Sequence, residues 1–142
     1  MAKRYYPLDA NTLFGEDITM TATGNVQKGG VDAVFKIGKG RQDMALVIDV
    51  SALAVSGGDE RCAFLLQGCN AEDFSDDIEN LAYLELGATG ARDGGARTSP
   101  VGRYGIPVSN DLIDEFTYVR LRLIAEGAAP SVTFTAWLSE RP

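Results

Sequence analysis

Apolar and polar residues alternate with a period of two along most of this 142-residue chain. No long segment repeats with the 3.6-residue period of an amphipathic helix. Successive side chains of a strand point to opposite faces, so this pattern predicts strands with one buried face and one solvated face. We expect strands over residues 18–23, 31–37, 44–53, 61–67, 81–86, 101–108, 117–123 and 132–138.

About eight short strands joined by turns that contain glycine and proline are typical of an all-β sandwich or jelly roll with antiparallel strands. The OB barrel is the alternative, but it fits this strand count less well. The length suits one domain that spans 1–142. Segments 117–123 and 132–138 flank a Gly-Ala-Ala-Pro turn, and we expect them to form an antiparallel hairpin with one wet face.

Only two segments are candidates for short helical turns. Segment 71–80 is rich in Asp and Glu, which suit the first turn of a helix. Segment 109–115 begins with Ser109 followed by acidic residues, which resembles a capped single turn. We therefore expect brief helical turns between strands.

The composition is that of a globular protein, with 45% hydrophobic and 23% charged residues. The longest apolar run, 44–50, is interrupted by Asp49 and is too short to span a bilayer. The N-terminal residues show no signal peptide, so we expect a protein made in the cytoplasm with no membrane partner. A net charge of −7 disfavours binding to nucleic acid, which requires clustered Lys and Arg.

The two cysteines, Cys62 and Cys69, lie seven positions apart. On one extended strand their Cα atoms would be roughly 23 Å apart, much farther than a disulfide allows. A turn at Gly68 and Asn70 would be needed to bring them together. We therefore favour two buried free thiols over a disulfide.

The residues that most enzymes use for proton transfer are largely missing. The chain contains no histidine, which removes the usual general base and the commonest zinc ligand. Two cysteines without CxxC spacing cannot form a tetrahedral zinc site, and no glycine-rich nucleotide motif occurs. We expect no enzyme activity, no catalytic residue, no cofactor and no metal.

One acidic segment is the main exception. It contains Glu72, Asp73, Asp76, Asp77 and Glu79. Such a cluster can bind Ca²⁺ or supply an acid/base pair, although it does not match the EF-hand pattern. We favour a solvated acidic segment that Phe74 and Ile78 anchor to the core.

A glycine- and arginine-rich loop is predicted over 87–105. Long loops of this kind inside a compact domain are usually functional or disordered. Its arginines, Arg92, Arg97 and Arg103, could order the loop against an acidic neighbouring subunit by paired hydrogen bonds. The alternative is a mobile loop without a partner.

The N-terminal arm, 1–12, combines basic and aromatic residues, which are enriched at interface hot spots. The alternative is a frayed terminus. By parity Trp137 lies on the non-core face, where an exposed tryptophan could be a subunit interface, a cation–π partner of Arg120 and Arg122, or a sugar platform. Internal packing is the other interpretation, and we favour interface or internal packing over the sugar platform. The candidate interface residues are therefore Lys3, Arg4, Tyr5, Tyr6, Arg92, Arg97, Arg103, Arg120, Arg122 and Trp137.

The chain resembles the jelly-roll cement proteins that decorate the heads of short-tailed phages of the Bordetella-phage type. The matching features are Leu13-Phe14, the segment 46–50, the segment 66–75, and the ending 120–123 through 132–138. The similarity spans most of the chain and lies in the order of strands and turns. The loop 87–105 is longer than the family pattern.

This resemblance implies a capsid decoration protein on the outer surface of a virion assembled in the host cytoplasm. It further implies binding to the major capsid protein, bridging of capsid subunits, and a homo-oligomer such as a dimer or trimer, with no catalytic residues. A carbohydrate-binding jelly-roll module is the alternative, with Trp137, Tyr83, Tyr104 and Tyr118 as its possible platform. A hydrolase that uses only carboxylates such as Asp73 or Asp77 is a third, weaker hypothesis.

Overall fold

The computed structural model describes residues 12–37, 43–55, 59–88, 90, 99–109 and 116–140. Within these ranges the chain forms eleven strands and no α-helix. The strands are β1 (Leu13–Met20), β2 (Gly24–Asn25), β3 (Gln27–Lys28), β4 (Val31–Asp32), β5 (Val34–Lys36), β6 (Asp43–Ala54), β7 (Arg61–Cys69), β8 (Glu79–Gly87), β9 (Gly102–Ser109), β10 (Tyr118–Glu126) and β11 (Ser131–Glu140).

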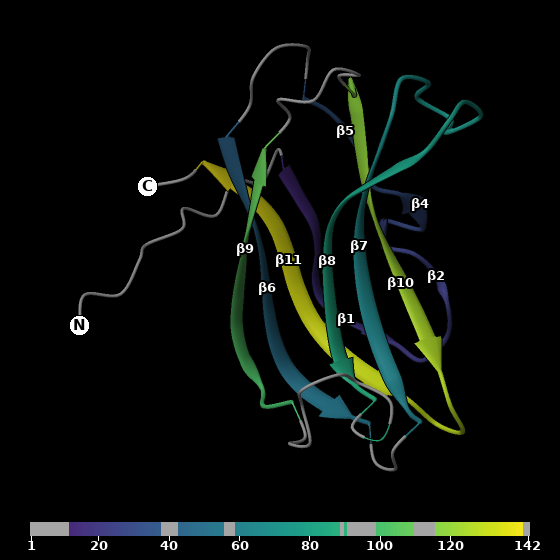
Figure 1. Ribbon diagram of the computed structural model, residues 1–142, viewed down its shortest axis with the longest axis vertical. Coiled ribbons are helices and arrows are strands. Elements are labelled where there is room, and N and C mark those ends of the chain that lie inside the picture. The colour runs from purple at the N-terminus through teal and green to yellow at the C-terminus, as the bar shows by residue number, and fades with distance from the viewer. Residues whose placement is uncertain are drawn as a thin grey trace.

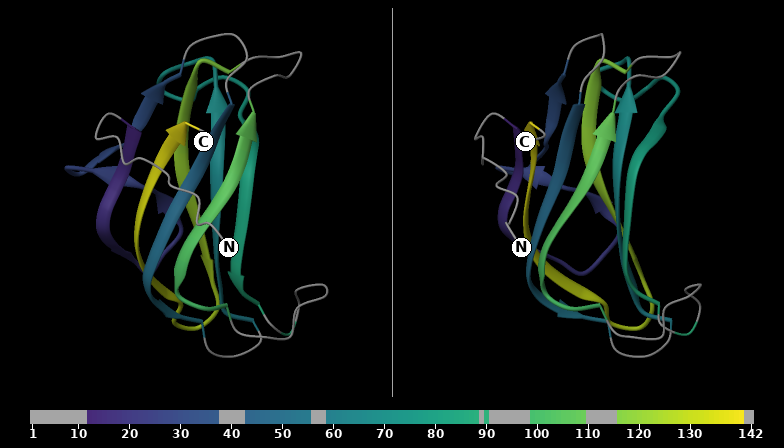
Figure 2. Two further views of the ribbon diagram at one scale, coloured as in Figure 1. Left: turned by 90° about the vertical axis from the view of Figure 1, so that its left-hand side faces the viewer. Right: turned by 60° about the vertical axis from the view of Figure 1, so that its left-hand side comes forward.

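The long strands form two layers, as Figures 1 and 2 show. Sheet A has the order β1-β11-β6-β9, and sheet B has the order β2-β10-β7-β8, with β5 also paired to β10. Strands β3 and β4 form a separate small hairpin. Every pairing is antiparallel. The predicted all-β sandwich is therefore confirmed.

The hydrophobic core lies between the two sheets because each long strand turns its alternate apolar residues inward. Val119 and Leu121 of β10 and Phe134 of β11 are completely buried. Phe64 of β7 meets Phe134 edge to face, with ring centroids 4.9 Å apart. This contact joins the inner faces of the two sheets.

The expected hairpin of the last two strands is wrong. β10 pairs with β7 in sheet B, whereas β11 lies between β1 and β6 in sheet A. The turn at residues 127–130 carries the chain from one sheet to the other. Alternation shows that each strand has an apolar face, but it does not show whether the two strands lie side by side or face each other across a core.

Several predicted boundaries also differ. The strand expected over 18–23 is β1, which begins at Leu13, and the segment 31–37 divides into β4 and β5 at Ala33. The predicted loop 87–105 is shorter, because Gly87 ends β8 and β9 begins at Gly102.

The helical turn expected over 71–80 is wrong. This segment contains a turn and bends, and its last two residues open β8. The carboxylate of Asp73 accepts hydrogen bonds from the backbone N–H of Ser75 at 3.1 Å and from its hydroxyl at 2.6 Å. Such local side-chain bonds stabilise turns at the expense of helix.

The other helical candidate, 109–115, can be compared only at its first residue. Ser109 ends β9, and residues 110–115 lie outside the described residues. No helix in the described part of the chain is long and apolar enough to cross a membrane.

Candidate functional site

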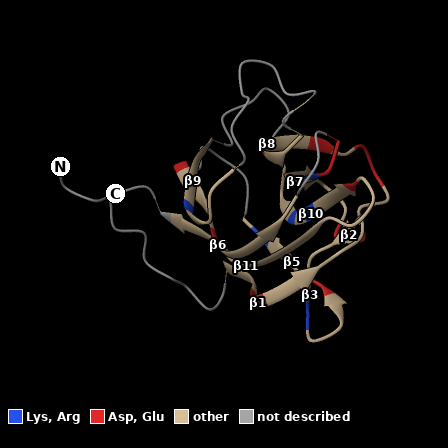
Figure 3. Cartoon of the chain, turned by 90° about the horizontal axis from the view of Figure 1, so that it is seen from below, with Lys and Arg blue, Asp and Glu red and all other residues tan. Residues whose placement is uncertain are grey.

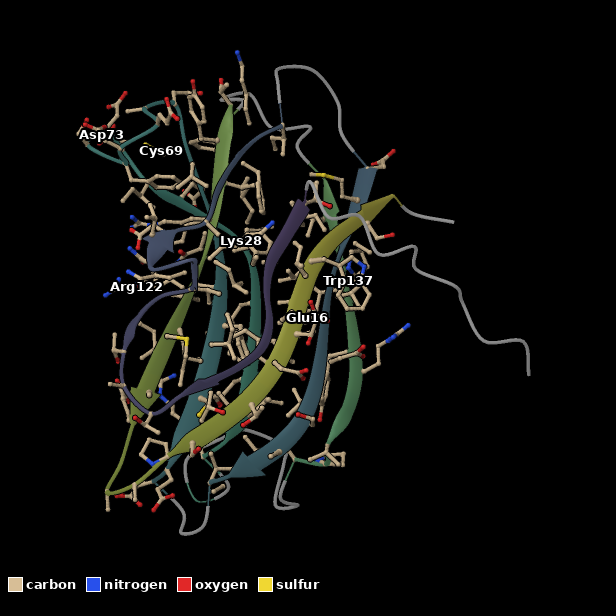
Figure 4. All side chains as sticks on the ribbon, turned by 180° about the vertical axis from the view of Figure 1, so that it is seen from behind. Glu16, Lys28, Cys69, Asp73, Arg122 and Trp137 are labelled. Atoms are coloured by element: carbon tan, nitrogen blue, oxygen red, sulfur yellow. The ribbon has the colours of Figure 1, made fainter. Side chains whose placement is uncertain are left out.

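The four candidate interface residues that the structure describes do not form one site. Lys3, Arg4, Tyr5, Tyr6, Arg92 and Arg97 lie outside the described residues. The other four fall on two different faces of the sandwich. Arg103 and Trp137 lie on the outer face of sheet A, and Arg120 and Arg122 lie on the outer face of sheet B. Figure 4 shows Arg122 and Trp137 well apart.

Trp137 lies on the non-core face, as parity predicts, but its side chain is buried there and not exposed. Its ring is buried in a small second cluster with Ala45 and Val47, against which Leu13 packs. The guanidinium of Arg103 lies over the ring, 5.2 Å from the centroid. The cation–π partner of Trp137 is therefore Arg103, and Arg120 and Arg122 belong to the other sheet.

Arg103 has a carboxylate partner within the chain. Its Nε and Nη2 donate to the two carboxylate oxygens of Asp49 at 2.6 and 2.7 Å. The register of β6 and β9 places these two residues directly opposite each other. The planar fork of arginine matches a carboxylate in this two-bond geometry. Arg103 is thus a cross-strand structural residue, not part of a loop that awaits a neighbouring subunit.

Arg120 and Arg122 of β10 have neutral hydrogen-bond partners. Arg120 Nε donates to Gln67 Oε1 at 2.9 Å, and its guanidinium lies 4.2 Å from the ring centroid of Phe74. Arg122 Nη1 donates to Asn25 Oδ1 at 2.9 Å. Within the described part of the chain, neither guanidinium forms a salt bridge. Partial burial, followed by repulsion from Arg122, lowers the pKa of Arg120.

The acidic segment between β7 and β8 is solvated, as expected, and Figure 3 shows its acidic residues along that loop. Phe74 is buried and anchors the loop, but Ile78 is 42% exposed, so its predicted anchoring role is wrong. Hydrogen bonds from Ser75 lower the pKa of Asp73. No group of three or more potential metal ligands occurs among the described residues.

A polar cluster that we did not predict lies on sheet B, at the end opposite the acidic loop. Arg61 Nη1 contacts Glu85 Oε2 at 3.0 Å, and Arg61 Nε contacts Glu126 Oε2 at 2.8 Å. The hydroxyl of Tyr83 donates to Glu85 Oε2 at 2.7 Å. The hydrogen bond to Glu126 raises the pKa of Arg61 above its ordinary value. The residues come from three strands, so only the pairing register reveals the cluster.

Both cysteines are buried free thiols, as predicted. Cys62 faces the core, where burial raises the pKa of its thiol to about 11. The thiolate is the reactive form of cysteine, so Cys62 is protected from oxidation and alkylation at neutral pH.

The four residues of the possible sugar platform do not lie together. Trp137 is buried on the outer face of sheet A, and Tyr104 packs against the main core. Tyr83 and Tyr118 belong to sheet B, where Tyr83 is 52% exposed. A flat platform formed by all four rings is therefore excluded.

Comparison with known proteins supplies no relative from which a site could be transferred. No protein-family model, no curated protein and no solved structure matches this chain. The function has to be inferred from the surfaces of this molecule alone.

Proposed function

We propose that this protein is a structural decoration subunit that binds the outer surface of a phage head and bridges its major capsid subunits. The observation that carries the proposal is the pair Arg120 and Arg122 on the outer face of sheet B, whose described hydrogen bonds go only to amide oxygens. Among the described residues, neither cation forms a salt bridge with a carboxylate. Such a surface suits adhesion to an acidic partner.

The distribution of proton-handling groups supports a mechanical role. The chain has no histidine, so the commonest general acid or base is absent, and the carboxylates of the acidic segment are the main candidates for proton transfer. Asp73, one of the two carboxylates considered for hydrolysis, accepts hydrogen bonds from Ser75, and these lower its pKa. A general acid at neutral pH needs a raised pKa instead.

The energetics of repeated binding suit a small β-sandwich that carries two such arginines. Two guanidinium groups can each form paired hydrogen bonds with carboxylates of a capsid subunit. Contact areas of about 1,600 Å² are typical of specific association, and repetition on a symmetric shell adds avidity to each contact. The shell would be stabilised because each decoration subunit binds adjacent major capsid subunits at the same time.

Binding to purified phage heads that lack the protein tests the proposal. Replacing Arg122 or Arg120 by Ser is expected to lower occupancy several-fold, and raised salt should lower the occupancy of the unchanged protein. Lys28→Ser removes one positive charge from the separate β3–β4 hairpin and serves as the matched control. Full occupancy with both arginines replaced would reject sheet B as the binding face.

The loop arginines Arg92 and Arg97 form a second, independent variant in the same assay. If they order against the shell, replacing both by Ser reduces occupancy while the free energy of unfolding stays unchanged. If no variant changes occupancy, neither the sheet B arginines nor the loop arginines form the binding surface. If the chain does not bind heads at all, the decoration hypothesis fails.

A further inference from the structure

Strand β8, at one end of sheet B (Figure 3), lacks the features that close the other edges of the sandwich. β1 has two register irregularities against β11, and β9 contains Pro107, which has no N–H to donate. β2 and β5, on the other side of sheet B, have only two and three residues. Bulged, proline-bearing and short edge strands resist the addition of a further strand. Among the described strands, β8 is therefore the one long edge without such protection, with nine residues and no proline.

The bonds of the neighbouring strands show which backbone groups of β8 point to this edge. The carbonyl of Leu121 in β10 accepts a backbone bond of 2.8 Å from the residue that follows β2, so it points away from β7. Backbone direction alternates along antiparallel strands, and the register therefore turns the polar backbone of Phe64 in β7 toward Leu84 in β8. The N–H and C=O groups of Tyr83 and Glu85, on either side of Leu84, consequently point to the open edge.

The side chains around β8 show that this edge is in contact with solvent. Tyr83 is 52% exposed, and Ile78, just before the strand, is 42% exposed. Leu84 packs against the core but is only partly buried. Gly87 ends the open stretch, since its N–H donates to Ser99 Oγ at 3.1 Å. A solvated edge with apolar side chains and outward backbone groups is suited to the addition of a strand.

We propose that β8 binds β8 of a second copy of this chain, so that sheet B continues across a two-fold axis. Two identical strands related by an axis perpendicular to their sheet run antiparallel, as do all the described strand pairs of this fold. With the axis at Leu84, Tyr83 of each copy lies opposite Glu85 of the other. Each of these two residue pairs can exchange two backbone hydrogen bonds, because both members direct their N–H and C=O groups outward.

The side chains suit pairing with an identical strand in this register. Leu84 lies opposite its own copy at a non-hydrogen-bonded position, where Cα atoms are only about 4.5 Å apart, so the two half-buried leucines cover each other. No carboxylate faces a carboxylate over residues 82–86. Glu85 is also neutralised within its own chain by Arg61 at 3.0 Å. The edge is therefore self-complementary in backbone, apolar contact and charge.

The inference goes beyond the proposed function and does not depend on capsid binding. A two-fold axis perpendicular to the sheet leaves the outer faces of both copies on the same side. β10 lies two strands from β8, so the arginine pairs of the two copies would be separated by five strand spacings, about 24 Å. A monomer that binds heads would reject the pairing of β8 and leave the decoration hypothesis intact.

Sedimentation velocity of the full chain from about 10 μM to about 1 mM tests the pairing, because an interface of one strand pair is small and associates weakly. The unchanged protein should pass from monomer to dimer over this range. Each copy has a net charge of −7, so added salt should raise the dimer fraction, although it weakens binding to heads. A chain that stays monomeric throughout overturns the proposal.

Tyr83→Pro removes an outward N–H and leaves the bonds to β7 intact, as proline does on natural edge strands. Because the dimer loses two hydrogen bonds, its dissociation constant should rise about tenfold or more. Tyr83→Ala keeps the N–H and should raise it no more than about threefold. Circular dichroism establishes that both variants are folded. Equal association of Tyr83→Pro and the unchanged protein would place the contact elsewhere and reject the proposal.

Disulfide trapping tests the register, and it decides the question where Tyr83→Pro does not fold. In Leu84→Cys the two new thiols meet across the axis, and oxidised glutathione should link the copies covalently. Ala82→Cys is the matched control, because its thiols lie four residues apart along the paired strands, about 14 Å, and should not be linked. Both variants retain the two buried native thiols. Equal linking of the two variants, or none in Leu84→Cys, would overturn the proposal.

A strand of a capsid protein is the other occupant that the measurements distinguish. If the chain stays monomeric and Tyr83→Pro, but not Tyr83→Ala, loses occupancy on heads, then β8 binds a capsid strand and the proposal of a second copy fails.

Discussion

At the scale of single residues, arginine has different partners on the two outer faces. Arg103 forms two hydrogen bonds with Asp49 and lies over Trp137, whereas Arg120 and Arg122 bind amide oxygens. In the first arrangement, the charge of Arg103 is neutralised by a carboxylate of the same chain. The second leaves charge that an acidic partner can neutralise. The residue type alone would assign all three to an interface.

The Arg103–Asp49 pair should contribute little to stability, because the two side chains are 47% and 36% exposed. We expect Asp49→Asn to lower the free energy of unfolding by less than about 1 kcal/mol, as for other exposed pairs. Urea unfolding measures the change, with the exposed Asp59→Asn as control. A loss of several kcal/mol would mean that the pair is much better shielded from solvent than its exposure indicates.

The buried thiol of Cys62 makes stability depend on pH in the alkaline range. Burial raises its pKa from 9.0 to about 11. Between these values the unfolded chain releases the proton and the folded chain retains it, so stability decreases as pH rises from about 9 to 11. The full effect is about 2–3 kcal/mol.

Urea unfolding of the wild type and of Cys62→Ala, at pH 8 and at pH 11, measures this contribution. Burial also raises the pKa of Tyr83, which acts in the same direction in both proteins. The loss of stability at pH 11 should therefore be smaller in Cys62→Ala. Equal losses in the two proteins would show that Cys62 is not the titrating group.

At the scale of elements, the connection between β10 and β11 requires a glycine at position 127, where neighbouring backbone atoms lie close. Gly127 has a φ of +103°, and a Cβ atom there would lie 2.7 Å from the Cα of Glu60. Gly87, at the end of β8, has a φ of +90°, and a Cβ atom there would lie 2.5 Å from the carbonyl oxygen of Glu60. Both glycines therefore allow neighbouring segments to pass close to the residue that precedes β7.

Gly127→Ala should destabilise the fold through backbone strain and steric overlap together. A left-handed conformation costs a non-glycine residue roughly 1–2 kcal/mol, and forcing atoms into a packed site adds about 1–3 kcal/mol. Gly29→Ala is the matched control, since Gly29 has a φ of +63° with nothing within 4 Å of the added atom. Equal costs in urea unfolding would mean that the contact with Glu60 relaxes freely.

At the scale of the whole molecule, stability depends on the contact between two sheets that share no backbone ladder. Phe64 and Phe134 are completely buried and meet across this interface. The sheets are linked by aromatic and branched side chains from opposite layers. Loss of one large ring should therefore weaken both layers together.

Phe134→Ala should lower the free energy of unfolding by about 3–5 kcal/mol, because it leaves a cavity in the core. Val31→Ala, at a side chain that is 69% exposed, should change it by no more than about 0.5 kcal/mol. Urea transitions followed by circular dichroism and by tryptophan fluorescence should coincide. Separate transitions would show that the two sheets unfold independently.

Sequence alone was enough to predict most of the long strands and the inward faces of the segments that form β10 and β11. The alternation in β10 and β11 reflects a local geometry with a period of two, which any sheet must satisfy. The prediction of two free thiols followed from the separation of Cys62 and Cys69 along one extended strand. The absence of histidine can also be read without coordinates, and the lack of enzyme activity inferred from it stays a prediction.

Only the tertiary structure decided which strands pair, which polar groups meet, and what is buried on the outer faces. β10 and β11 have similar patterns whether they form a hairpin or face each other across the core, so their placement depends on contacts with β7 and β6 that are distant in sequence. For the same reason Arg61 meets Glu126, and Trp137 is buried instead of exposed. Parity fixes the face on which a side chain lies, but long-range packing determines what covers that face.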